Sequence, residues 1–190
     1  MSLTLRIFVV LSLITNLSAQ DKICEVKHKD IDEQSAIIKS QTYDNVYWLC
    51  NDSGDKPFVF PVTEQGKMIV PDFMKKRYIG DKIDDYPGIK IKNASLIDWE
   101  AMSVLNDTLV IGDVGNNGNT RRDMGVYIIP EPNPRATYET RPLLWLPVRY
   151  EDQSKYPADE WEFDCESMFT FKGKIYFLTK HRADRQIRKP

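Results

Sequence analysis

Histidine and cysteine are scarce in this chain of 190 residues, which has two histidines and three cysteines. His28 and His181 lie far apart, and no two of Cys24, Cys50 and Cys165 form a Cys-x-x-Cys pair. A zinc site of the ordinary kind takes four Cys or His ligands at close sequence spacing, so it is poorly supported. A Ser-His-Asp triad is improbable for the same lack of histidine.

An excess of charge of one sign is also missing, because 26 basic residues face 28 acidic residues for a formal net charge of −2. This balance gives no electrostatic reason to expect a nucleic-acid partner. The sequence has no Gly-x-Ser-x-Gly nucleophile elbow and no phosphate-binding loop that opens a helix. Eleven prolines and nine glycines separate short apolar runs, a pattern that favours strands and turns over long helices.

Long apolar runs are confined to the N-terminus, where residues 7–17 follow Arg6 and precede the small residues Ser18 and Ala19. This run is too short to span a bilayer. We therefore expect a signal peptide over residues 1–19, a secreted or periplasmic protein, and no membrane span after cleavage. An oxidising compartment would allow a disulfide, with Cys24 and Cys50 as one pair. The alternative is that all three cysteines are small apolar side chains.

A five-residue pattern recurs along the chain. DWEAM begins at residue 98, DCESM begins at residue 164, and a degenerate copy, EQSAI, begins at residue 33. Each copy is followed by an apolar strand, a polar turn and a second apolar strand. Third strands are predicted at 57–62 and 125–130, and fourth strands within 88–97 and 141–150.

Four strands per unit at a nearly constant spacing are typical of the blades of a β-propeller. A β-sandwich is the alternative, but it has no reason to reuse one motif at a fixed period. We expect an all-β protein in which residues 20–190 form a partial propeller with about two and a half blades. The blades start near residues 33, 98 and 164. The expectation is an N-terminal portion of a larger propeller, or a chain that associates with itself through open strand edges.

The motifs also carry a family resemblance. In order they are NDSG at 51–54, DWEAM at 98–102, IGDVGNN at 111–117, PEP at 130–132, DCESM at 164–168 and TK at 179–180. The chain resembles a largely uncharacterised family of secreted, mostly bacterial, β-propeller proteins over about residues 35–182. More distantly, that family is similar to propellers with phytase, lactonase or esterase activity. This second likeness concerns the fold and not the chemistry.

The repeated acids are the candidate metal ligands. The first strand of a propeller blade lines the central channel, and alternation places residues i and i+2 on one face. Asp98 would then lie with Glu100, and Asp164 with Glu166, at one mouth of the channel. Converging carboxylates need a cation, and calcium suits them best, with magnesium as the alternative. The structural alternative is that the acids only hold blades in register, while the residue between them packs in the core.

Polar residues at the ends of the second strands are the candidate ligand-binding residues: Asp52, Asp113, Asn117, Arg121 and Lys180. They would ring the same mouth and bind an anionic small molecule or a glycan. The alternative for the glycine- and asparagine-rich part is a turn that uses these residues for positive φ angles.

These features predict a non-catalytic extracellular binding or scaffolding protein with a calcium site. One alternative is a metal-dependent hydrolase of phosphoesters or lactones. The other is a truncated product without function.

Overall fold

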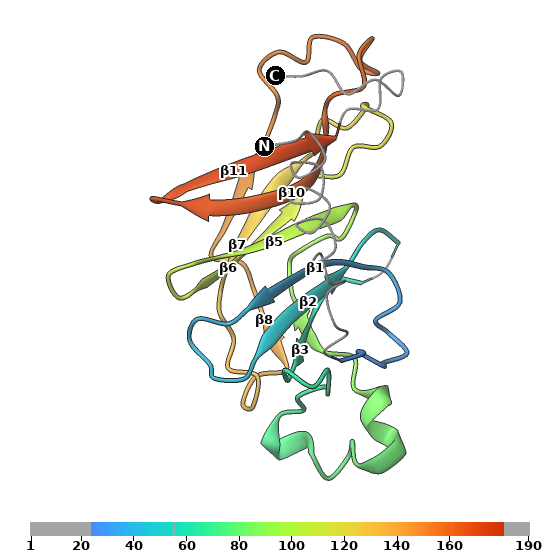
Figure 1. Ribbon diagram of the computed structural model, residues 1–190, viewed down its shortest axis with the longest axis vertical. Coiled ribbons are helices and arrows are strands. Elements are labelled where there is room, and N and C mark those ends of the chain that lie inside the picture. The colour runs from blue at the N-terminus through green and yellow to red at the C-terminus, as the bar shows by residue number, and fades with distance from the viewer. Residues whose placement is uncertain (1–23, 55, 181–190) are drawn as a thin grey trace, which may run out of the picture.

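The computed structural model describes residues 24–54 and 56–180, and the regular secondary structure of this part of the chain is almost entirely β-strand. Its strands form three sheets (Figure 1). The all-β expectation is confirmed. The predicted signal peptide and His181 lie outside the described residues. Within the described part, no helix is long and apolar enough to cross a membrane.

The first sheet has five strands in the order β1-β2-β3-β4-β8, and its last pair is parallel. The second has the order β5-β6-β7-β9, and the third is the hairpin β10-β11. The bounds of the first sheet are β1 Gln34–Lys39, β2 Tyr47–Asn51, β3 Phe58–Val62, β4 Ile89–Ile91 and β8 Glu139–Thr140. Those of the other two sheets are β5 Trp99–Leu105, β6 Thr108–Asp113, β7 Gly125–Pro130, β9 Leu144–Pro147, β10 Asp164–Phe171 and β11 Lys174–Lys180.

The strands fall where the sequence predicted them, and β7 has the predicted bounds of 125–130. The tight hairpin turns at 106–107 and 172–173 are also present, with Asn106, Lys172 and Gly173 at positive φ. One strand was not anticipated. β8 comes from the second repeat but pairs with β4 of the first sheet, so it straps the two sheets together.

Each copy of the five-residue pattern forms the same local structure, an irregularity near the start of the first strand. The pairing register shifts between Gln34 and Ala36 in β1, between Trp99 and Ala101 in β5, and between Cys165 and Ser167 in β10. The residues without a Cα partner are therefore Ser35, Glu100 and Glu166. A β-bulge of this kind re-aims a side chain and breaks the strict alternation on which the sequence argument relied.

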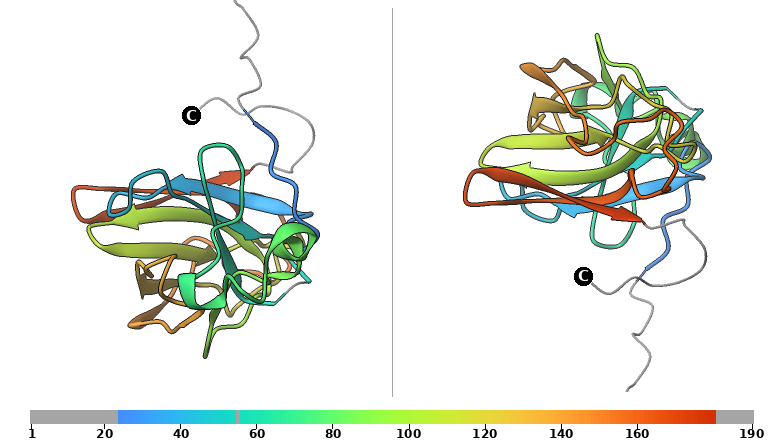
Figure 2. Two further views of the ribbon diagram at one scale, coloured as in Figure 1. Left: turned by 90° about the horizontal axis from the view of Figure 1, so that it is seen from below. Right: turned by 90° about the horizontal axis from the view of Figure 1, so that it is seen from above.

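The three sheets stack through their first strands, with β5 lying between β1 and β10 (Figures 1 and 2). The β1-β2, β5-β6 and β10-β11 hairpins lie one above another with their turns on the same side (Figure 1). Trp48, Trp99 and Ile111 are fully buried between the first two sheets. Val110 and Cys165 are fully buried between the second and third sheets.

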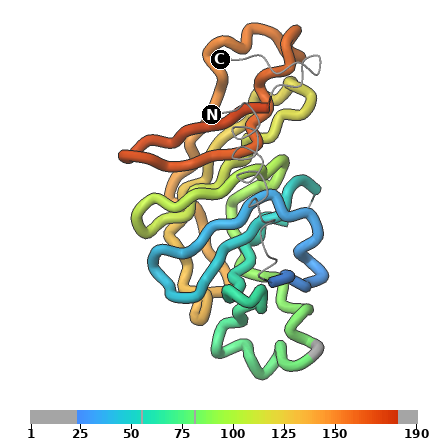
Figure 3. Tube along the Cα trace, viewed as in Figure 1, coloured from blue at the N-terminus to red at the C-terminus, as the bar shows by residue number. Residues whose placement is uncertain are grey.

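Residues 63–88 form an excursion between β3 and β4, at the end of the molecule furthest from β10-β11 (Figure 3). It contains two 3-10 helices, η1 Asp72–Met74 and η2 Gly80–Asp85. Together with the N-terminal segment near Ile31, it covers Leu49 and Phe60 on the outer side of the first sheet.

Hydrogen bonds that involve side chains also tie neighbouring sheets. The Trp48 Nε1–H donates to Glu131 Oε1 at 2.7 Å, which joins the first sheet to the second. The Thr170 Oγ1–H donates to the carbonyl of Val104 at 2.6 Å, which joins the third sheet to the second. The Thr170 amide also donates to Ser103 Oγ at 3.1 Å.

Replacing Thr170 by valine should destabilise the protein, because valine keeps the shape and removes the hydroxyl that bridges β10 and β5. The expected loss is about 1–2 kcal/mol in the free energy of unfolding, measured by urea denaturation. Thr120→Val, at an exposed position in the loop after β6, is the matched control and should change it by less than about 0.5 kcal/mol. Equal losses in the two variants would mean that the Thr170 hydroxyl does not hold the sheets together.

Candidate functional site

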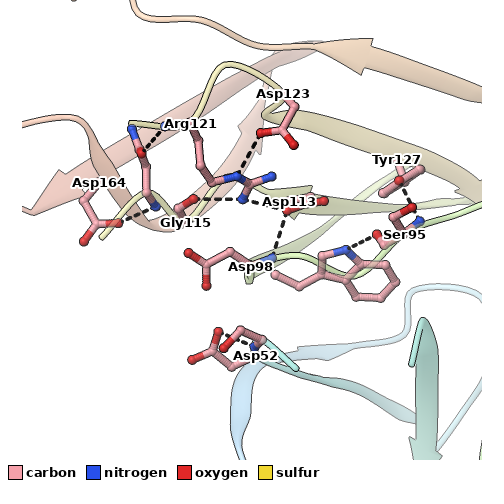
Figure 4. A network of polar contacts seen from close by, with 12 residues as sticks. Asp52, Ser95, Asp98, Asp113, Gly115, Arg121, Asp123, Tyr127 and Asp164 are labelled. Atoms are coloured by element: carbon pink, nitrogen blue, oxygen red, sulfur yellow. Dashed lines mark hydrogen bonds and ion pairs between the residues drawn. The ribbon is translucent and has the colours of Figure 1, made fainter. Parts of the chain in front are cut away.

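Three carboxylates meet at the junction of the first and second sheets, at the end of the hairpins opposite their turns. Asp52 follows β2, Asp98 precedes β5, and Glu100 is the bulged residue of β5. One oxygen atom from each lies within 4.8 Å of the other two. Figure 4 shows the Asp98 side chain extending over the end of the first sheet, above Asp52. No other group of this kind occurs in residues 24–54 and 56–180.

The backbone around Asp98 is fixed by the end of β6 and the loop that follows. The Asp98 amide donates to Asp113 Oδ1 at 3.0 Å, and the Gly115 amide donates to the Asp98 carbonyl at 3.1 Å. Gly115 also passes very close to the Asp98 side chain, since a Cβ there would lie 2.3 Å from Asp98 Cγ. Only glycine fits at this position while the Asp98 carboxylate keeps its place.

Arg121 is held by the same loop and does not reach out as a free cation. Its Nη1 lies 2.9 Å from Asp113 Oδ1 and donates to the Gly115 carbonyl at 2.8 Å (Figure 4). Its Nε donates to Asp123 Oδ1 at 3.2 Å. Burial raises the pKa of Asp113, and the Arg121 guanidinium opposes that rise. The Asp113–Arg121 pair is thus a buried support for the backbone beneath Asp98.

The carboxylates crowd one another strongly. Burial, and next the hydrogen bond and negative charge of Asp52, raise the pKa of Asp98 to about 7. Burial and then the charges of Asp52 and Asp98 raise the pKa of Glu100 to about 8. A group of carboxylates that retains protons near neutral pH is one that a cation would stabilise in its ionised form.

The acids of the third repeat lie beside this group and not inside it. Asp164 Oδ1 accepts a hydrogen bond from the Asn116 amide at 2.7 Å. Glu166 forms an ion pair with Lys180, at 3.2 Å between Oε1 and Nζ. The charges of both acids nevertheless contribute to the raised pKa of Glu100.

The structure therefore groups the predicted metal ligands and the predicted ligand-binding residues differently from the sequence analysis. Of the four predicted metal ligands, Asp98 and Glu100 come together, and Asp52, predicted to bind a ligand, joins them. The remaining predicted ligand-binding residues are dispersed. Asp113 and Arg121 pair with each other, Asn117 is exposed in the loop after β6, and Lys180 contacts Glu166.

One residue important to the site escaped the sequence analysis, and the counterpart of Asp113 in the first repeat was misplaced. Gly115 was treated as part of a turn, although it clears the space for Asp98. Asn51 was grouped with Asp52, but the strand register makes it the counterpart of Asp113. Its side chain plays a similar part, because Asn51 Nδ2 donates to the carbonyl of Asp30, in the segment before β1, at 2.7 Å. Aligning the repeats by their paired strand positions, rather than by their motifs, would have revealed that Asn51 and Asp113 are equivalent.

The structural role predicted for the repeat is present as well. Trp99 and Cys165, the second residues of their copies, are fully buried between sheets. All three cysteines are free: Cys50 and Cys165 are buried and Cys24 is exposed. The five-residue pattern thus combines a residue that packs between sheets with acids at the end of the hairpins opposite their turns.

Replacing Gly115 by alanine should displace the Asp98 carboxylate, because the added methyl group would occupy its space. The expected cost is about 1–3 kcal/mol in the free energy of unfolding, measured by urea denaturation. Gly118→Ala in the same loop is the matched control, since the nearest atom to its Cβ is Thr120 Oγ1 at 3.4 Å. A Gly115→Ala protein as stable as the control would contradict the close contact with Asp98.

The raised pKa values predict how stability depends on pH when no metal is bound. The ordinary pKa values of these Asp and Glu side chains are 3.8 and 4.5, so the folded state binds more protons than the unfolded state up to about pH 8. The free energy of unfolding contributed by these groups therefore falls as pH rises from about 4 to 8. In chelator, the thermal midpoint should be lower at pH 8 than at pH 5. Glu100→Gln should reduce this difference, and an unchanged difference would contradict the assignment to Glu100.

Comparison with known proteins supplies no relative for this chain: no family model, no curated protein and no solved structure matches it.

Proposed function

We propose that this chain is an exported β-propeller protein that binds Ca²⁺ through Asp52, Asp98 and Glu100. In this proposal it serves in extracellular binding or scaffolding without catalysis. The observation that carries the proposal is the convergence of three carboxylates from two adjacent sheets, with one oxygen of each within 4.8 Å of the others.

The propeller assignment is supported by the way in which the repeats are arranged. Each unit begins with a bulged first strand, and these strands contact one another in sequence order as β1, β5 and β10. The second unit continues outward as the four-stranded meander β5-β6-β7-β9. Radial repetition of such four-stranded units is the plan of a propeller. Membership of the secreted bacterial family is likewise a proposal, and it rests on the order of the sequence motifs.

Calcium fits this site for three physical reasons. It is a hard cation that takes carboxylate oxygens, and it tolerates an irregular arrangement of 6–8 ligands. A bound divalent ion would offset the repulsion that raises the pKa values of Asp98 and Glu100. Magnesium demands a nearly ideal octahedron at short distances, which side chains from two separate sheets satisfy less readily. Extracellular modules that bind calcium typically have dissociation constants of about 0.1–1 mM, and an exported chain would meet such concentrations.

The hydrolase alternative has one supporting observation. Glu100 is half-buried beside Asp52 and Asp98, and its pKa is raised to about 8, which suits a general acid or base near neutral pH. A metal-dependent hydrolase of phosphoesters or lactones would use a carboxyl group in that position. We favour the binding function because the three carboxylates suffice for it, whereas a hydrolase also requires a positioned substrate.

The calcium proposal is tested by thermal unfolding at pH 7.5 with Ca²⁺ and with chelator. Calcium at 100 times its dissociation constant should stabilise the folded state by about 2.7 kcal/mol, seen as a higher thermal midpoint. Asp52→Asn and Glu100→Gln should each abolish the shift, because each removes a charged ligand. They should also raise the midpoint in chelator, because each relieves repulsion.

The matched control is Asp44→Asn, since Asp44 is an exposed aspartate in the turn at the opposite end of the β1-β2 hairpin. It should keep the full calcium shift. If calcium leaves the wild-type midpoint unchanged, or if Asp52→Asn shifts as much as the wild type, the three carboxylates do not form a calcium site.

A further inference from the structure

The outer face of the third sheet is apolar, and nothing in the described part of the chain covers it. Its side chains include Phe169, Phe171, Tyr176 and Leu178, which are 44%, 55%, 39% and 54% exposed. The Phe169 and Tyr176 rings stack with their centroids 4.9 Å apart, so part of this face is already ordered. Four large apolar side chains on one face of a hairpin form a patch that usually marks an interaction site.

The repeat shows what covers this face elsewhere in the molecule. Gly112 and Ser103 occupy in the second sheet the positions that Leu178 and Phe169 occupy in the third. Both lie beneath β10. A Cβ on Gly112 would be 3.6 Å from Met168 Cε, and Ser103 Oγ lies 3.0 Å from Thr170 Oγ1. The natural cover for such a face is therefore the bulged first strand of a following sheet.

In the described part of the chain, β1 is the first strand that has no sheet packed in front of it, although the N-terminal segment and the excursion cover its neighbour Leu49. Ile37 of β1 corresponds to Met102 of β5 and Met168 of β10 in the repeat. Both methionines are buried against the preceding sheet, whereas Ile37 is 60% exposed. A groove of about 180 Å³ lies beside Ile37 and is lined by Val26, Tyr47 and Val62 among others. The third sheet thus exposes an apolar patch, and the first sheet exposes Ile37 with an apolar groove beside it.

Charges at the two ends are also complementary. By strand register, Lys180 occupies in the third sheet the position of Asp52 in the first, and Glu33 corresponds to Asp98. The contact between the first and second sheets brings Asp52 close to Asp98. The same contact between the third sheet of one copy and the first sheet of another would bring Lys180 close to Glu33. Ile37 would then lie over Leu178, just as Met168 lies over Gly112.

We propose that the outer face of the β10-β11 hairpin docks on β1 of a second copy of this chain. Two copies joined in this way at both ends would form a closed ring of six sheets, a number within the range of known propellers. Each contact is heterologous, pairing two different surfaces, and a two-fold axis makes the two contacts equivalent. This inference concerns the partner and does not depend on the calcium site.

The test is the mass of the purified chain in solution, measured by light scattering in chelator so that calcium binding plays no part. We expect twice the mass of one chain. Ile37→Asp and Leu178→Asp should each weaken dimerisation by about 100-fold or more, because each buries an unpaired carboxylate in an apolar contact. Ile79→Asp is the matched control, since Ile79 is 62% exposed on the excursion between β3 and β4, and it should leave the dimer intact.

Mixing the two variants tests the heterologous geometry. One chain with Ile37→Asp and one with Leu178→Asp can form one contact in which both surfaces are unaltered, so the mixture should form dimers that neither variant forms alone. Circular dichroism and thermal unfolding check that both variants fold.

Three results would overturn the proposal. A wild-type chain with the mass of a single copy would show that the two faces do not meet. Assemblies larger than two copies would exclude the closed ring. A dimer that Leu178→Asp dissociates but Ile37→Asp leaves intact would show that the third sheet pairs with itself.

Discussion

The packing of one bulged first strand against the next is the interaction on which the rest of this structure depends. β5 lies between β1 and β10, and the apolar residues of each contact are buried from both sides. A hairpin alone is marginally stable in water, so the β10-β11 sheet depends on its contact with β5. At both contacts the pattern supplies a buried packing residue, Trp99 or Cys165, and a bulged glutamate at the same places.

The same packing creates the electrostatic problem at the junction of the first two sheets. Stacking the strands brings the ends of β2 and β5 together, and with them Asp52, Asp98 and Glu100. Gly115 confines the Asp98 side chain, while the Asp113–Arg121 pair anchors the backbone on either side of it. Asp98 therefore cannot move freely away from the other two acids, and the repulsion among them is relieved by protons or by a cation. The proposed calcium site follows from this confinement more than from the number of acids.

The two ends of the stack of sheets present different surfaces, the outer face of β10-β11 at one end and the first strand β1 at the other. Because the units repeat, these two surfaces are of the same kinds as those that meet inside the stack. Each contact joins the outer face of one sheet to the first strand of the next, and within the described residues β1 and the outer face of β10-β11 take part in no such contact. These two surfaces carry exposed Ile37 and Leu178 and the opposite charges of Glu33 and Lys180. The proposed dimer uses the internal contact of the protein a second time, between chains.

The sequence by itself determined the all-β class, the strand positions and the repeat, because alternating apolar residues, tight turns and the recurring pattern are local signals. It also predicted that the Asp98 and Glu100 side chains lie together, although its reason, strict alternation along the strand, fails at the bulge. Only the tertiary structure decided that Asp52 completes the group and that Asp164 and Glu166 lie beside it. It alone revealed that β8 pairs with β4 of the first sheet, and that only glycine at position 115 leaves room for the Asp98 carboxylate. These features depend on the bulge and on which strand ends meet between sheets. Contacts between residues far apart in the chain leave no periodic signal in the sequence around them.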